Sequence, residues 1–211
     1  MQYDLSTATY SPDGRVFQIE YALKAVDKSG LALGVRCLDG VVLGVEKLVE
    51  HKMLVPSSGK RIGAIDKHAG MALAGLAADA QKLLNVGKDE AYKYRDFYGT
   101  QAPGHVLASR IAYALLCLNS SGRSEVHTYT LYVNLRPFGA SVLLATYDDA
   151  HGPQLYTIDP VGTAYRYFGA AIAKQKAAAK TELEKIDFKK ITCREAVYII
   201  SNMWVFVWIC I

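Results

Sequence analysis

The sequence predicts an α+β fold, in which helices cover sheets built from hairpin-connected strands. The chain has 211 residues, of which 51% are hydrophobic, and this suits a single domain with a sizeable core. Strand-like and helix-like segments come in separate blocks, in the order strands, helices, strands, helices. These blocks argue against the alternating pattern of a parallel sheet and favour a layered sandwich of helices and antiparallel sheets.

The first block is predicted to contain four strands. Leu31–Arg36 and Val41–Glu46 are β-branched and aliphatic runs joined through Leu38-Asp39-Gly40. An Asp-Gly pair supplies the positive φ that a tight turn requires, so these two runs should form a hairpin. A second pair of strands, Arg61–Ile65 and Met71–Ala74, should form another hairpin.

The second block is predicted to be helical. Good helix formers dominate residues 76–98, where the apolar side chains fall roughly on one face of a helix. A second helix should begin after Pro103-Gly104, because apolar residues follow there at helical spacing.

The last two blocks repeat the order of strands and then helices. Residues 171–185 are rich in Ala and Lys without Pro or Gly, which favours a helix. Thr192 and Glu195 have the spacing of a capping box and should open a final helix. Turn-rich segments separate three predicted strands, which are Ala140–Tyr147, Gln154–Ile158 and Ala164–Phe168.

Composition and charge identify no partner or cofactor. The formal net charge is +4, without the Lys/Arg block of a nucleic-acid arm or a membrane patch. The four cysteines are far apart and no apolar signal core follows Met1, so we expect a reducing location in the cytoplasm and nucleus. The histidines have no HExxH or CxxC companion, and phosphate-loop and serine-hydrolase motifs are missing. We therefore expect no metal, no cofactor, no nucleic acid and no membrane among the ligands.

A series of short motifs carries the strongest functional signal. Tyr3-Asp4 precedes a turn segment that contains Pro12-Asp13-Gly14, and helix-like residues follow it. Each piece alone has an ordinary structural explanation, since Pro-Asp-Gly is a good turn by itself. The signature residues of this segment are Ser11, Pro12, Asp13, Gly14, Arg15, Gln18, Glu20 and Tyr21. Further motifs follow at residues 44–47, 75–80, 136–139, 154–156 and 159–160.

Together, these motifs make the chain resemble the alpha-type subunits of the eukaryotic 20S proteasome over residues 3–113 and 126–197. The resemblance implies a four-layer α/β/β/α sandwich, the fold of N-terminal-nucleophile hydrolases and proteasome subunits. It implies a heteroheptameric ring with other alpha subunits, which contacts beta subunits, gates the pore with N-terminal tails and docks regulatory particles. It also implies a gate tail and turn at residues 1–15 and a subunit domain at residues 16–197, followed by an atypical apolar tail at residues 198–211.

The resemblance also implies that the chain has no catalytic residue. A proteasomal nucleophile is an N-terminal Thr, whose hydroxyl is activated by the free α-amine with help from a lysine and an acid. If the Asp39-Gly40 hairpin is matched to that of catalytic beta subunits, the nucleophile position falls near Gly30, which has no hydroxyl. Glu46 falls near the position of the acid, and we expect it to have a structural role.

By the same resemblance, Tyr3 and Asp4 belong to the gate, where a phenol and a carboxylate can exchange hydrogen bonds between open and closed states. Pro12 would set where the tail leaves the body of the subunit, because its ring fixes φ. Lys60 or Arg61 would receive the C-terminal carboxylate of an activator in the docking pocket, and the sequence leaves the choice between them open.

Two stretches depart from the family pattern. Residues 114–125 look like an insertion within a helix, and Asn119-Ser120-Ser121-Gly122 should break or bulge that helix. Residues 198–211 carry no charged side chain, but they are fewer than the roughly 20 residues of a membrane span. An apolar, β-prone end is an aggregation hazard unless the sandwich buries it. A spliced variant of an alpha subunit would explain both departures.

Two other functions are compatible with the sequence. The chain could be a catalytic N-terminal-nucleophile hydrolase, which would require a cut that exposes a residue such as Ser29, and a lysine to assist it. It could also be a non-assembling splice variant of an alpha subunit, as the insertion and the altered end predict. An intact N-terminus on the mature chain would exclude the first function, and presence in assembled proteasome would exclude the second.

Overall fold

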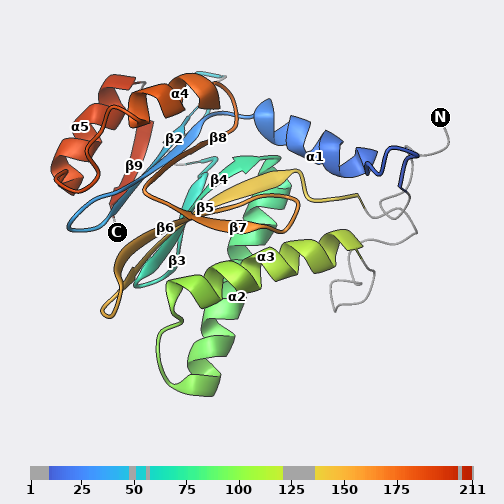
Figure 1. Cartoon of the computed structure of the whole chain (residues 1–211), viewed down its shortest axis with the longest axis horizontal. Coiled ribbons are helices and arrows are strands. Elements are labelled where there is room, and N and C mark those ends of the chain that lie inside the picture. The colour runs from blue at the N-terminus through green and yellow to red at the C-terminus, as the bar shows by residue number, and fades with distance from the viewer. Residues whose placement is uncertain (1–9, 48–50, 56–57, 121–135, 204–205, 211) are drawn as a thin grey trace.

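Two antiparallel sheets are stacked face to face, and helices lie over the outer face of each sheet (Figure 1). This computed structural model describes residues 10–47, 51–55, 58–120, 136–203 and 206–210, and all their side chains except those of residues 117–120, 203 and 206–210. The layers confirm the predicted α/β/β/α sandwich. In the described part of the chain, no helix is long and apolar enough to cross a membrane.

The first sheet has the strand order β8-β1-β2-β9. Its central strands form the predicted hairpin about Asp39-Gly40, with Ala32 opposite Val45 and Arg36 opposite Val41. The outer strands pair antiparallel with this hairpin on either side. The strands are β1 (Ala32–Arg36), β2 (Val41–Glu46), β8 (Gly169–Ile172) and β9 (Phe206–Cys210).

The second sheet has the order β3-β4-β5-β6-β7, so each strand lies beside its neighbour in the sequence. Both helices of the second block are inserted between β4 and β5, which nevertheless pair along the whole length of β4, from Ala69 opposite Thr146 to Gly75 opposite Ala140. The strands are β3 (Ile62–Asp66), β4 (Ala69–Gly75), β5 (Ala140–Asp148), β6 (Gly152–Ile158) and β7 (Ala164–Tyr167).

The helices form the outer layers and one end of the sandwich (Figure 1). The second sheet is covered by α2 and α3, and the first sheet by α4 and α5, while α1 contacts β4 and β5. The helices are α1 (Phe17–Asp27), α2 (Ala77–Tyr98), α3 (Gly104–Ser120), α4 (Lys176–Leu183) and α5 (Cys193–Met203).

Three buried apolar clusters fill the three spaces between the four layers. One lies between α2, α3 and the second sheet, one between the two sheets, and one between the first sheet and the helices α4 and α5. Alternate residues of β5 illustrate the division, because Leu144 joins the first cluster and Leu143 the second. Side chains of a strand point alternately to its two faces, so a strand that is buried on both sides is mostly apolar, as β5 is apart from the buried Ser141 and Thr146.

The prediction of a helix over residues 171–185 is wrong at its start. Gly169–Ile172 forms β8, which pairs with β1, and α4 begins only at Lys176. The Ala-rich sequence favours a helix locally, but these small residues fit between the two sheets, where Ala170 and Ile172 are buried. The capping box is confirmed, because Thr192 N donates to Glu195 Oε2 at 3.0 Å and Glu195 N donates to Thr192 Oγ1 at 3.4 Å.

The two atypical stretches continue regular elements as far as the structure describes them. α3 runs without interruption through Ala114 to Ser120, and the rest of the stretch where a break was expected, residues 121–125, lies outside the described residues, so that expectation stays a prediction. At the other end, α5 runs across residue 197 to Met203. β9 then pairs with β2, with Phe206 opposite Glu46 and Cys210 opposite Val42. The backbone of the apolar end is therefore part of the first sheet.

Candidate functional site

Gly30, Glu46 and Arg61 meet where β1 begins and β2 ends. The hairpin register brings Leu31 beside Glu46, so that Glu46 N donates to Leu31 O at 2.8 Å and Leu31 N donates to Glu46 Oε2 at 3.0 Å. Arg61 lies just before β3 and is held there by its backbone carbonyl, which accepts a hydrogen bond of 2.8 Å from Leu73 N. Three segments that are distant in sequence thus converge at one glycine.

A side chain at position 30 would meet both charged groups of this cluster. A Cβ atom there would lie 3.2 Å from Arg61 Nη1 and 3.5 Å from Glu46 Oε2. The expected structural role of Glu46 fits its hydrogen bond to the backbone of Leu31. Gly30 itself offers no hydroxyl, and the space that a nucleophilic side chain would need is taken by Arg61.

The two cations proposed for the docking pocket have different surroundings. Lys60 is exposed, whereas Arg61 is half-buried, and its Nη1 atom has no hydrogen-bond partner within the described part of the chain. A buried guanidinium nitrogen without a partner is costly, because a buried donor loses its hydrogen bonds to water. A carboxylate that reached Nη1 would restore such a bond and would also balance the charge.

The N-terminal signature forms a closed turn ahead of α1. Gly14 N donates to Ser11 O at 2.9 Å, and Arg15 N donates to the Ser11 hydroxyl at 3.0 Å. Gly14 has a φ of 75°, which glycine adopts without strain. The predicted turn at Pro12-Asp13-Gly14 is therefore confirmed, with Pro12 exposed at its corner. Tyr3 and Asp4, the other predicted gate residues, lie outside the described residues.

The rest of the signature fixes the turn to α1. Arg15 donates two hydrogen bonds to Glu20, with Nε–Oε1 and Nη2–Oε2 distances of 2.6 and 2.7 Å. This fork raises the pKa of Arg15, chiefly through the hydrogen bond to Glu20 and then through its charge. The helix buries Ala22 and Val26, whereas the signature residue Tyr21 is 43% exposed.

Two of the other sequence motifs contact each other, which the sequence alone did not indicate. Asp79, from the motif at residues 75–80, accepts hydrogen bonds from Arg136 Nη1 at 2.6 Å, Arg136 Nη2 at 2.8 Å and Gly139 N at 2.9 Å. The hydrogen bond to Asp79 is the main reason why the pKa of Arg136 is raised. This cluster joins the start of α2 to the start of β5. In the sequence, the only sign of this contact is that one motif carries an acid, Asp79, and the other a base, Arg136.

The histidines of the described segments either hydrogen-bond within the chain or are exposed. His68 is buried with its Nε2 atom 2.8 Å from Ala102 O, and His151 Nδ1 lies 2.9 Å from Asp148 Oδ2. This contact with His151 is the largest cause of the lowered pKa of Asp148. No group of three His, Cys, Asp or Glu residues within the described segments could hold a metal ion.

Comparison with known proteins gives consistent matches over almost the whole chain. Residues 26–203 match the family described as proteasome subunit, and residues 3–25 match the N-terminal signature of A-type proteasome subunits. The chain is 52% identical over 201 residues to the alpha type-3 proteasome protein of Spinacia oleracea, an overlap of 95% of this chain and 76% of that protein. The alpha type-3 proteasome protein of Acanthamoeba castellanii is also 52% identical, over 92% of this chain and 73% of that protein.

A more distant relative gives the same result. The probable alpha type-7 proteasome protein of Schizosaccharomyces pombe is 41% identical, over 92% of this chain and 72% of that protein. The N-terminal signature, the sandwich and these relatives agree, and the chain belongs to the family of proteasome alpha-type subunits.

Proposed function

We propose that the chain is a non-catalytic member of the alpha ring of the 20S proteasome core. In this role it scaffolds the barrel with other alpha subunits and with beta subunits, contributes to the gate, and helps to dock regulatory particles in ubiquitin-dependent protein degradation. The observation that supports the non-catalytic part is at Gly30, which offers no hydroxyl, while the guanidinium of Arg61 lies where a side chain at that position would extend. Arginine stays protonated in proteins, so Arg61 cannot relay a proton as a lysine can.

The catalytic alternative has less support. It requires a cut that makes a residue such as Ser29 the free N-terminus, with its hydroxyl available for attack. Ser29 Oγ donates instead to Val26 O at 2.7 Å, and Ser29 N donates to the same carbonyl at 2.9 Å. Both bonds hold Ser29 to the end of α1.

Docking of an activator is proposed to use Arg61 in preference to Lys60. The Nη1 atom of Arg61 is buried and has no hydrogen-bond partner in the described part of the chain, so a carboxylate that displaced its neighbours and reached it would meet an unused donor. Lys60 is exposed to solvent, where an ion pair contributes little. The gate role of Tyr3, Asp4 and Pro12 rests on the matched N-terminal signature and on the closed turn at Ser11–Arg15.

Assembly is tested first, with the tagged full-length chain expressed in its native cells. The lysate is resolved on a native gel, and mass spectrometry of the peptidase-active band shows whether the chain is present together with peptides from residues 114–125 and 198–211. Presence is expected. Absence beside normal proteasome would identify the chain as a non-assembling variant and would refute the proposal. Imaging of the tagged chain is expected to show it in both cytoplasm and nucleus.

Docking is tested on particles that contain the tagged chain, with a peptide that ends in a free carboxylate and carries a photoreactive group beside it. We expect Arg61→Ala to reduce labelling of the tagged chain roughly 10- to 100-fold, the equivalent of one charge-assisted hydrogen bond. Lys60→Ala is the matched control and should label normally. Equal losses for the two variants, or equal labelling by a C-terminally amidated peptide, would contradict the choice of Arg61.

A further inference from the structure

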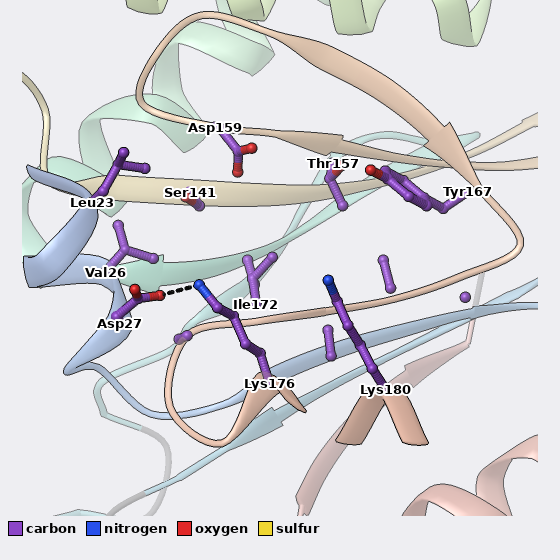
Figure 2. A pocket seen from close by; sticks show the side chains of 14 residues that line it. Leu23, Val26, Asp27, Ser141, Thr157, Asp159, Tyr167, Ile172, Lys176 and Lys180 are labelled. Atoms are coloured by element: carbon purple, nitrogen blue, oxygen red, sulfur yellow. Dashed lines mark hydrogen bonds and ion pairs between the residues drawn. The ribbon is translucent and has the colours of Figure 1, made fainter. Parts of the chain in front are cut away.

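A cavity of about 260 Å³ opens where α1, β8 and α4 come together (Figure 2). The end of α1 supplies one wall with Asp27, and α4 supplies another with Lys176 and Lys180. Ser141 of β5 and Thr157 of β6 add hydroxyl groups from the second sheet. The cavity is separate from the cluster at Gly30, and the proposed function does not use it.

The two lysines of this cavity differ in whether an ion pair balances their charge. Lys176 Nζ donates to Asp27 Oδ1 at 2.7 Å, so its charge is balanced within the chain. Lys180 has no ion pair within 4.0 Å among the described residues, and Figure 2 shows its amine directed towards the side of the cavity that Thr157 and Tyr167 form. Since α4 begins at Lys176, the positive end of its helix dipole also lies at this wall. The free charge of the cavity is therefore positive on the α4 side.

Asp159, the second acid of the cavity, forms no ion pair with Lys180 within 4.0 Å. Asp159 lies across from Lys180 in Figure 2 and belongs to the loop between β6 and β7. Burial is the main reason why the pKa of Asp159 is raised, while the two lysines and a hydrogen bond from Ser141 act in the opposite direction. Ser141 donates a hydrogen bond to Asp159, whereas Lys180 acts on Asp159 through its charge without an ion pair within 4.0 Å among the described residues, so its amine can still donate to an incoming group.

The strand β7 lies at the edge of the second sheet beside this cavity, and most of its side chains are exposed. In β7, Tyr165 and Tyr167 are 57% and 45% exposed, and Phe168 after it is 54% exposed. Arg166, on the opposite face of the strand, is also exposed, so both faces of β7 reach the surface. Edge strands are commonly protected by charge, proline or a covering segment, and aromatic residues are enriched where another protein binds.

We propose that this cavity receives an Asp or Glu side chain from a neighbouring proteasome protein, whose carboxylate pairs with Lys180 while its backbone lies along β7. Charge on the α4 side favours a carboxylate, because a cationic side chain there would approach Lys180 and the start of α4. A carboxylate that stays clear of Asp27 and Asp159 gains an ion pair with Lys180 and lies near the hydroxyls of Thr157 and Tyr167, which line the same cavity. The aromatic residues of β7 then pack against the neighbour. This inference rests on the proposed function, since it requires an assembled particle.

The test uses a zero-length carbodiimide, which joins a lysine amine to a carboxylate only where the two are in contact. Native particles that contain the tagged chain are treated with it, and cross-linked peptides are identified by mass spectrometry. The expected product is an amide between Lys180 and an Asp or Glu of another protein of the particle. The Lys180→Arg variant should assemble and lose this product, because arginine keeps the charge but does not couple.

Acetylation by an amine-reactive ester gives an independent readout on the same particles. Lys180 is exposed in the free chain and should lose its reactivity when the chain moves from the free to the assembled fraction, while Lys189, which is also exposed but lies outside the cavity, should keep it. Unchanged reactivity of Lys180 in assembled chain, or coupling of Lys180 only to Asp27 or Asp159 of its own chain, would overturn the inference and leave the proposed function intact. A chain that is absent from the particles overturns both.

Discussion

Removal of the Asp79 carboxylate should destabilise the fold far more than removal of an ordinary acid from the same helix. Asp79 is 7% exposed and accepts three hydrogen bonds, of which one comes from the buried N–H of Gly139. In Asp79→Ala this N–H loses its partner, which costs about 1–3 kcal/mol. The guanidinium of Arg136 is 58% exposed and regains water, so the lost ion pair adds only about 1 kcal/mol. The expected total is about 2–4 kcal/mol.

The assay for this prediction is urea unfolding of the full chain, followed by circular dichroism, for the parent and for Asp79→Ala. Asp89→Ala is the matched control, because Asp89 is an exposed acid on the same helix and should change the free energy of unfolding by less than about 0.5 kcal/mol. Arg136→Ala should cost less than Asp79→Ala, since it leaves the acid free to keep its bond to Gly139. If Asp79→Ala is no more destabilising than the control, the argument that this cluster fastens α2 to β5 is refuted.

Three further predictions concern pH and backbone geometry. The hydrogen bond from the backbone N–H that starts α5 lowers the pKa of Asp39, so the stability that it gives is present above the unfolded pKa of about 3.9 and is lost as pH falls through the lowered folded value. Asp39→Asn should therefore flatten the acid limb of a urea-midpoint profile, and an unchanged limb would contradict this. Burial raises the pKa of Asp159, so the stability linked to its protonated form is present below about pH 3.9 and is lost as pH rises through the raised folded value. Asp159→Asn should consequently gain stability relative to the parent at pH 7 but not at pH 3, and a gain that is equal at both values would refute the assigned cause. Gly75→Ala should cost more than about 2 kcal/mol, because Gly75 has a φ of 117° and a Cβ would collide with the carbonyl of Gly139, whereas Gly99→Ala, at a φ of 70° with open space around it, should cost about 1 kcal/mol in the same assay.

Much of the candidate site at Gly30 could be predicted because its features are local. The hairpin through Asp39-Gly40 sets the register of β1 and β2, and this register alone brings Glu46 beside the start of β1. The lack of a hydroxyl at position 30 is likewise visible in the sequence. The choice between Lys60 and Arg61 for the docking pocket stays a prediction. What the sequence could not show is that the guanidinium of Arg61 lies beside Gly30, because that depends on how β3 is placed against the first sheet.

The sequence by itself determined the elements whose stabilising contacts lie within a few residues. The capping box at Thr192, the turn that ends at Gly14 and the long helix α2 are of this kind, since their hydrogen bonds close over short loops. Tertiary structure decided the features that depend on contacts between segments far apart in the sequence. Gly169–Ile172 became a strand because β1 offers an open edge and the intersheet layer accepts small side chains, which outweighs the helix propensity of alanine. Likewise, the pairing of Asp79 with Arg136 and the cavity beside Lys180 exist only once the four layers are stacked, because neither has a periodic or local signature in the chain.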